Sequence, residues 1–188
     1  MINLANDSKG MTLIELLCTL SIVAILSTIA APSLTHLFLQ SEAVTSMNQL
    51  TSFIRLTKNT ALNQSTIMTL CPSLNGQSCA TEWGKGIMLF SDINGNAQLD
   101  DEDKLIQFKS PFLNNGTLKW LSLRNRVQFS SRGLPHGTIG SFIYCPESAD
   151  EHYGKSAIIS FQGKVRLGKD TNQDGIVESG NKQNISCS

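Results

Sequence analysis

The hydrophobic pattern changes twice along the chain and divides it into three stretches. From Met11 to Ala31 nearly every residue is apolar, and the exceptions are small hydroxyl side chains, Cys18 and one carboxylate, Glu15. A helix needs about 20 apolar residues to cross a bilayer. A domain of this size is also too small to enclose a helix that is apolar on all sides. The pattern therefore predicts the transmembrane half of a helix over residues 11–33.

The second stretch continues the helix in amphipathic form. Apolar residues recur at helical spacing, separated by Ser, Thr, Asn, Gln and Lys. These apolar positions are Val44, Met47, Leu50, Ile54 and Ala61. The spacing predicts an amphipathic helix half over residues 34–63, ending near Asn63, whose apolar face packs on the rest of the protein.

Short β-type runs make up the third stretch, which we expect to form a β-rich globular domain over residues 64–188. The predicted strands are Thr66–Cys71, Gly86–Ser91, Lys104–Phe108, Thr117–Leu123, Val127–Ser130, Thr138–Cys145, Ala157–Phe161 and Lys164–Leu167. Asn-Gly, Arg-Gly and Gln-Gly pairs mark turns between them. Connections this short suit only hairpins and meanders. The expected fold class is therefore α+β, with one long helix packed on antiparallel sheets.

Composition limits the choice of partners. The chain has 15 basic and 15 acidic side chains, so its formal net charge is zero. This balance argues against bulk attraction to nucleic acid but leaves room for a local basic patch. The part that follows the apolar helix has the length of one domain.

Four of the five cysteines lie in the β-rich stretch: Cys71, Cys79, Cys145 and Cys187. If this stretch is exported, the even number predicts two disulfides. Four cysteines allow three pairings, and the short spacing favours Cys71–Cys79, which leaves Cys145–Cys187 to hold the C-terminal tail. A zinc site is the alternative, but no Cys-x-x-Cys pair is present and histidine is sparse.

Glu15 is the unusual residue of the apolar stretch. A carboxylate in a membrane helix is costly and indicates a function. No Lys or Arg lies elsewhere in the run, so its partner must come from another chain, from the chain's own terminus or from water. A cleaved secretory signal is the alternative, but its apolar region is expected to be shorter, about 7–15 residues.

The N-terminus resembles the class III leader junction of type IV pilins and type II secretion pseudopilins, because Gly10 is followed by Met-Thr-Leu-Ile-Glu. The resemblance implies that prepilin peptidase removes residues 1–10 as a leader by cutting after Gly10. It implies N-methylation of Met11, where the family usually has Phe. It also implies that Glu15 contacts the N-terminal amine of a neighbouring filament subunit, and that Pro32 kinks the helix.

Motifs in the β-rich stretch resemble the GspH/FimT branch of this family, which includes FimT and FimU. They are Cys71-Pro72 with the later Cys79, Trp83-Gly84-Lys85-Gly86, Ser91-Asp92-Ile93-Asn94-Gly95-Asn96 and Ser131-Arg132-Gly133. The resemblance implies a minor pilin or pseudopilin anchored by one span in the cell inner membrane, with a periplasmic C-terminal domain. It would join other pilins in the priming or tip complex of a type IV pilus or a type II secretion filament. A monomeric membrane-anchored domain is the alternative, but it would leave Glu15 unpaired.

A later motif suggests a further function. Phe161-Gln162-Gly163-Lys164-Val165-Arg166 resembles the turn at which FimT-type members carry Gly-Arg-x-Arg. In those members the segment contributes to DNA binding in natural transformation. The resemblance implies DNA uptake as the alternative function, with Lys164 and Arg166 on phosphates and with Arg132 and Lys169 as further candidate contacts. A solvated hairpin edge guarded by basic residues is the plainer interpretation.

Two acidic loops predict calcium sites of different strength. In the stronger, Asp170, Asn172, Asp174 and Glu178 place oxygen ligands at alternate positions around a glycine. The weaker loop offers Asp92, Asn94, Asn96, Asp100 and Asp103. The alternative is that Asp, Asn and Gly serve only as turn formers.

No catalytic constellation accompanies these motifs. His36, His136 and His152 are scattered, and no nucleophile motif or phosphate-binding glycine loop lies near them in the sequence. We therefore interpret the chain as a non-enzyme.

Overall fold

The structure, a computed structural model, describes residues 11–187; for residues 29–33 it describes the backbone but not the side chains. The chain divides into two compact units, Met1–Phe38 and Leu39–Ser188. Helix α1 (Leu13–Gln64) contributes its first half to one unit and its second half to the other. The two units are described separately below.

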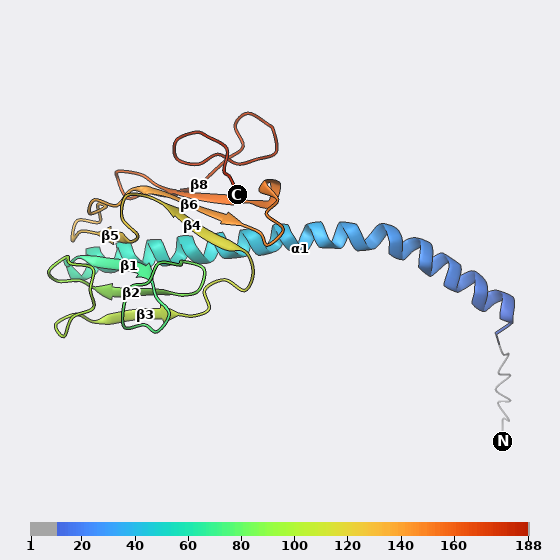
Figure 1. The fold of residues 1–188 in the computed structure, drawn as a ribbon, viewed down its shortest axis with the longest axis horizontal. Helices are drawn as coiled ribbons and strands as arrows, with labels where there is room; N and C mark the ends of the chain where they lie inside the picture. Colours follow the sequence, from blue (N-terminus) through green and yellow to red (C-terminus); the bar gives the residue numbers. More distant parts are fainter. Residues whose placement is uncertain (1–10, 188) are drawn as a thin grey trace, which may run out of the picture. The chain divides into compact units, whose positions relative to one another are not determined.

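Eight strands and a short 3-10 helix follow α1 in the second unit. They are β1 (Met68–Pro72), β2 (Ile87–Ser91), β3 (Leu105–Lys109), β4 (Thr117–Leu121), β5 (Val127–Phe129), β6 (Gly140–Cys145), η1 (Glu151–Tyr153), β7 (Lys155–Ile159) and β8 (Val165–Leu167). The strands form two four-stranded antiparallel sheets, in the orders β3-β2-β1-β5 and β4-β6-β7-β8 (Figure 1). The predicted α+β fold class is confirmed.

Strand β5 belongs to the first sheet, although it lies in sequence between two strands of the second. Its neighbours in sequence, β4 and β6, pair with each other in the second sheet. β5 itself pairs with β1 in the first sheet, with Val127 opposite Leu70 and Phe129 opposite Met68. The second half of α1 runs alongside both sheets in Figure 1, so both can pack on the same helix.

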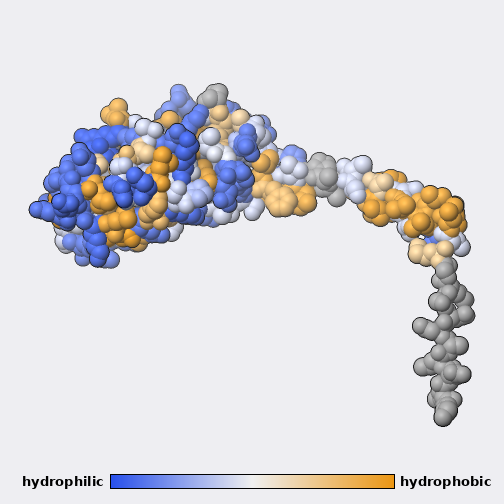
Figure 2. Space-filling model, turned by 60° about the horizontal axis from the view of Figure 1, so that its bottom comes forward, coloured by the Kyte–Doolittle hydropathy of each residue, from blue (hydrophilic) through white to orange (hydrophobic). Residues whose placement is uncertain are grey.

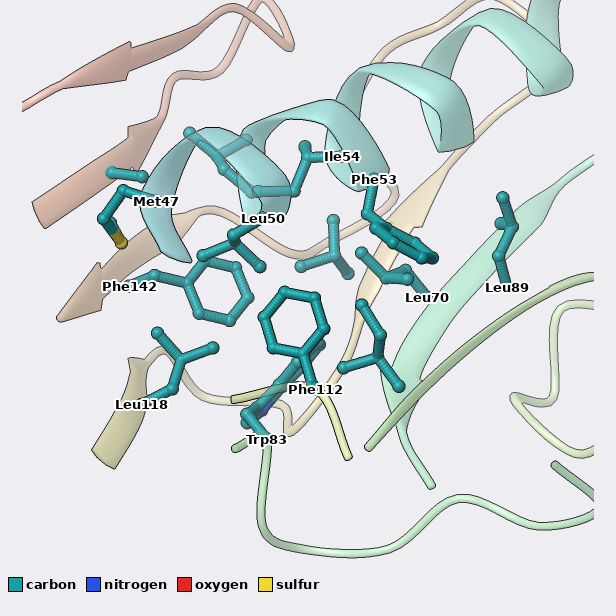
Figure 3. Close-up of a cluster of buried hydrophobic side chains, with 14 of the residues drawn as sticks. Met47, Leu50, Phe53, Ile54, Leu70, Trp83, Leu89, Phe112, Leu118 and Phe142 are labelled. Atoms are coloured by element: carbon teal, nitrogen blue, oxygen red, sulfur yellow. The ribbon is translucent and has the colours of Figure 1, made fainter. Parts of the chain in front are cut away.

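The core forms where α1 meets the two sheets. Met47, Leu50 and Ile54 are fully or almost fully buried, and Phe53 is buried beside them. Figure 3 shows these side chains facing Leu70, Leu89, Trp83, Phe112, Leu118 and Phe142. The members of all three buried apolar clusters lie within Leu39–Ser188. Because this unit has its own core and both complete sheets, it can fold by itself.

Two details of the predicted elements are wrong. Val44 was placed on the apolar face of α1, but its side chain is 44% exposed, and the fully buried Ala43 occupies that position one turn before Met47. β7 begins and ends two residues earlier than predicted, because Ser160 already belongs to the turn that follows. α1 ends at Gln64, where Ser65 takes a left-handed backbone conformation with φ of 53°.

Candidate functional site

The N-terminal candidate site is described from Met11 onward, and Gly10, the predicted cleavage position, lies outside the described residues. Helix α1 begins at Leu13, and the backbone N–H of Glu15 donates to Oγ1 of Thr12 at 3.3 Å. Thr12 and Glu15 therefore have the spacing of a capping box at the helix start. The carboxylate stands where the helix dipole favours a negative charge.

Over the described residues, the first half of α1 carries exposed apolar side chains (Figure 2). The exposed large apolar residues of this half and its start are Met11, Leu13, Ile14, Leu16, Leu17, Leu20, Ile22, Val23, Ile25, Leu26, Leu34, Leu37 and Phe38, each 49–79% exposed. A helix that is apolar around its circumference needs lipid or other helices to cover it. Among the helices searched within the described residues, none has the combined length and apolarity of a membrane span. The side chain of Pro32 lies outside the described ones.

The pair favoured by its short spacing and the pair that remains are both bonded in the structure. Cys71 is joined to Cys79 across 8 residues, and Cys145 is joined to Cys187 across 42. The second bridge ties the C-terminal segment to the end of β6, where Ile185 packs against Ile143. All four thiols of the β-rich stretch are thus used, and Cys18 is free and exposed in α1.

The turn between β7 and β8 is held by its own backbone. The N–H of Ser160 donates to the carbonyl oxygen of Lys164 at 3.0 Å, and the N–H of Gly163 donates to that of Ser160 at 2.8 Å. Gly163 has φ of +69°, in the left-handed region that side chains disfavour. This tight turn leaves Phe161 and Lys164 exposed at its two sides.

This turn packs against α1 and against a second glycine turn. Nζ of Lys58, on α1, donates to the carbonyl oxygens of Gln162 and Gly163 in the β7–β8 turn at 3.3 and 3.1 Å. A Cβ on Gly163 would lie 2.6 Å from the carbonyl oxygen of Gly133, and one on Gly133 would lie 3.0 Å from the side chain of Leu62. The fold therefore sets the turn that carries Arg132 directly against the turn that carries Lys164.

Arg166 faces away from the core in the middle of β8. It lies opposite Ile158 of β7, whereas its neighbour Val165 packs against the core. Between β8 and α1 runs a groove of about 380 Å³ lined by Asn48, Thr51, Ser52, Arg55, Val165, Arg166 and Leu167. Sequence reasoning missed Arg55, because the helical pattern assigns it only to a solvated face. The available signal was that Arg55 and Lys58 are spaced one helical turn apart, which places two cations on one face of α1.

Four exposed cations lie on these adjoining elements. Arg55, Arg132, Lys164 and Arg166 are exposed, and none forms an ion pair with another described residue. The segments that supply them contain no Asp or Glu, and these segments are residues 43–81, 104–146 and 152–169. We call these four residues the basic surface. The zero net charge of the chain thus conceals a strongly uneven distribution.

Lys169, the remaining DNA-binding candidate, belongs to a different neighbourhood. It follows β8 on the side away from the turn, and its carbonyl oxygen accepts the N–H of Glu178 at 3.1 Å. Lys169 therefore adjoins the acidic C-terminal loop, while Lys164 lies in the turn before β8, which packs against the turn that carries Arg132.

The acidic loop over residues 170–178 uses its carboxylates to hold itself. Asp170 accepts two backbone N–H groups of the loop at 2.6 and 2.8 Å. The buried Glu178 accepts from the hydroxyl and the N–H of Thr171, and the hydroxyl bond is the main cause that lowers the pKa of Glu178. The side-chain amide of Asn184 is the main cause that lowers the pKa of Asp174. These bonds keep both carboxylates ionised.

Calcium binding stays a prediction for both loops. In the stronger loop Asn172 turns its amide nitrogen toward Asp174, at 2.8 Å. In the weaker loop Asp92 is fully buried and accepts from Thr69 of β1 and Gln128 of β5, while the other predicted ligands lie in the β2–β3 loop. Those ligands are Asn94, Asn96, Asp100 and Asp103. Within the described part of the chain, no group of three or more His, Cys, Asp or Glu side chains is arranged to hold a metal ion.

Comparisons with known proteins agree with the fold of the β-rich unit and with the predicted N-terminal motif. A family model described as type II transport protein GspH matches residues 46–163, and a model of the prokaryotic N-terminal methylation motif matches residues 5–31. Two crystal structures of the type IV minor pilin FimU from Pseudomonas aeruginosa are similar. The first has a TM-score of 0.59 and a sequence identity of 16%, and the alignment covers 79% of this chain and 96% of FimU. The second has a TM-score of 0.54 and a sequence identity of 15%, and the alignment covers 77% of this chain and 98% of FimU. The minor pseudopilin EpsH from the type 2 secretion system of Vibrio cholerae aligns with a TM-score of 0.49 and 12% identity, covering 67% of this chain and 95% of EpsH. A search of curated proteins finds no match.

The family match decides the assignment. At these low identities the FimU structures support the fold alone. The GspH model spans more than half of the chain, from the second half of α1 to the β7–β8 turn. The methylation-motif model spans the predicted cleavage position and Glu15. The chain therefore belongs to the GspH family of pilin-like proteins, which are structural components rather than enzymes.

Proposed function

We propose that this chain is a minor pilin or pseudopilin that assembles with other pilins into a type IV pilus or a type II secretion filament. One observation carries the proposal: the only charge of the apolar stretch, Glu15, stands in the first turn of a helix whose described apolar side chains are exposed over its first half. The capping contact with Thr12 satisfies a backbone donor but does not neutralise the carboxylate. In apolar surroundings this charge needs a cationic partner, and the N-terminal amine of a neighbouring subunit would supply one.

Maturation follows from the same segment. In our proposal prepilin peptidase cuts after Gly10 and methylates Met11, and the first half of α1 rests in the inner membrane until assembly. The methylation-motif match and the uncovered apolar surface support this. The two disulfides support a periplasmic location of Leu39–Ser188, since disulfides persist in oxidising compartments.

Replacing Glu15 tests the assembly proposal. Glu15→Ala should abolish incorporation into filaments, measured by immunoblotting of sheared filament fractions. Glu15→Gln keeps a capping acceptor but removes the charge, so it should fail as well if charge pairing is what matters. Glu82→Ala, which removes a surface ion pair with Lys85, is the control and should assemble normally. Normal incorporation of Glu15→Ala would contradict the proposal.

We place the subunit in the priming or tip complex of the filament. FimU, which has a similar fold, is described as a minor pilin, and a subunit present in few copies suits a filament end better than a shaft. Immunogold labelling with antibodies against Leu39–Ser188 should mark filament ends. Labels spaced evenly along the shaft would argue against this position.

DNA binding is a second candidate function, and the basic surface favours it. Its arginine and lysine side chains come from α1, from β8 and from two adjoining turns, and they have no acidic neighbours in their own segments. Such a surface can bind phosphates in any sequence. Lys164 presents a point charge where an arginine would offer a planar fork, which should lower affinity without removing binding.

The salt dependence of binding tests this second function. The fragment Leu39–Ser188 should bind duplex DNA more weakly as salt rises, and Lys164→Ala/Arg166→Ala should reduce the slope of log K against log salt by about 2. Lys85→Ala/Lys104→Ala removes two exposed charges outside the basic surface and is the matched control. DNA binding is excluded if the wild-type fragment shows no salt-sensitive binding.

A further inference from the structure

An aromatic side chain stands among the cations of the basic surface. Phe161 is 81% exposed, although burying such a ring would be favourable. The turn that carries it is held by the Ser160 and Gly163 backbone bonds and is clamped to α1 by Lys58. The exposed ring is therefore presented from a fixed turn, and the fold leaves it available to a ligand.

A shallow recess adjoins this ring on the outer face of the second sheet. Its volume is about 490 Å³, and apolar side chains make up most of the exposed area of its lining. The lining includes Leu121, Ser141, Ile158, Phe161, Arg166 and Asn181. Arg166 lines this recess and also the polar groove between β8 and α1. The side chain of Arg166 thus lies between the polar groove and the apolar recess that contains Phe161.

This combination fits a nucleic acid with exposed bases. A duplex keeps its bases stacked inside and would offer this surface only phosphates, leaving Phe161 and the recess in contact with water. A single strand presents phosphates and base faces together, and aromatic side chains beside basic grooves bind such strands by stacking. We infer that the basic surface binds single-stranded DNA, with phosphates at Arg55, Lys164 and Arg166 and a base stacked on Phe161. The inference rests on the proposed DNA-binding function and names its substrate class.

Three ligands of equal length separate base contacts from phosphate contacts. The fragment Leu39–Ser188 is titrated, by fluorescence anisotropy, with labelled oligothymidylate of about 20 nucleotides, with an abasic strand of the same charge and with a duplex. Oligothymidylate should bind about tenfold more tightly than the abasic strand, because stacking at one base contributes about that factor. The duplex should bind no more tightly than the abasic strand does.

Substitutions at Phe161 locate the base contact. Phe161→Ala should remove the difference between oligothymidylate and the abasic strand and leave duplex binding unchanged, whereas Phe161→Trp should keep the difference. Leu123→Ala, at a fully exposed apolar residue outside the recess, is the matched control and should change nothing. Circular dichroism of each variant checks folding, which substitution of so exposed a ring should not disturb.

The outcomes distinguish this inference from the function on which it rests. If all three ligands bind equally, Phe161→Ala is silent and Lys164→Ala/Arg166→Ala still weakens binding, DNA binding stands and the single-strand inference is overturned. If no ligand binds the wild-type fragment, both fail. Binding of an acidic peptide in preference to every oligonucleotide would overturn both as well and would assign the surface to a protein partner.

Discussion

The two halves of α1 have the same secondary structure and opposite surroundings. In the first half Leu20 is 58% exposed, as are its apolar neighbours to a similar degree. In the second half Leu50 is fully buried between the two sheets. Both residues are leucines of one continuous helix, so the difference lies in what the rest of the chain places around them.

The difference shows how one helix can serve two purposes. The second half has apolar residues on one face, and that face organises a domain with its own core and two disulfides. The first half is apolar all round, so no single domain face can cover it. Its cover must come from lipid or from other subunits, and Glu15 is the one charge in this half that a partner can neutralise.

The largest expected effect comes from separating the two halves. The fragment Leu39–Ser188 should be a soluble monomer in plain buffer, because most of its large apolar side chains are buried in its own core and the exposed ones are scattered. The complete chain should require detergent, because the described apolar side chains of residues 11–26 and 34–38 are exposed. Light scattering with and without detergent measures this. Aggregation of the fragment, or a monomeric complete chain in buffer, would break the comparison.

Local patterns predicted much of this fold. Each of the eight strands lies within two residues of its predicted position at either end, and α1 ends one residue later than predicted. Helical spacing, turn dipeptides and cysteine spacing act over a few residues, so the sequence displays them directly. The N-terminal junction is equally local, and the methylation-motif match covers it.

The sequence named Arg132, Lys164 and Arg166 as candidate DNA contacts. It could not predict the order of the strands or which elements come together around these residues, because both depend on distant contacts. Nothing in a run of three residues shows that β5 leaves its neighbours to pair with β1. The approach of Gly163 to Gly133, which brings Arg132 beside the β7–β8 turn, joins residues 30 positions apart. Arg55 enters the basic surface only because β8 lies along α1. The sequence motif makes Lys169 a further candidate contact, and the structure places Lys169 beside the acidic loop.

A matched pair of leucine substitutions compares how much each half of α1 contributes to the stability of the domain, and its expected effect is smaller. Leu50→Ala should lower the free energy of unfolding of the domain by about 2–5 kcal/mol, because it leaves a cavity in the core. Leu20→Ala removes the same atoms from the same helix and should change it by less than about 0.5 kcal/mol. Urea unfolding of the complete chain in detergent, followed by the fluorescence of the buried Trp83, measures both.

This pair can fail in an informative way. If Leu20→Ala destabilised the domain as much as Leu50→Ala, the first half of α1 would be part of the domain's cooperative unit. If both were silent, the core around Leu50 would contribute little to stability. Only the asymmetric result supports two separately stabilised halves.

The smallest effect concerns the C-terminal loop. The pKa of Glu178 is lowered from 4.5, mainly by its bond from the hydroxyl of Thr171. A lowered pKa in the folded state stabilises the fold above the unfolded pKa, and this stabilisation is lost as the pH falls through the folded pKa.

The Tm of Leu39–Ser188 should therefore fall as the pH drops from about 5 to about 3, over the range in which carboxylates titrate. Glu178→Gln should lower the Tm slightly at pH about 7 and make it depend less on pH in that range. Glu147→Gln, at an exposed carboxylate of the β6–β7 loop, is the control and should retain the wild-type pH dependence. The disulfide between Cys145 and Cys187 ties the C-terminal segment to β6. Weakening the contacts of the C-terminal loop should therefore lower the stability of the whole domain. An unchanged pH dependence in Glu178→Gln would show that the loop, like the first half of α1, contributes nothing to the stability of the domain.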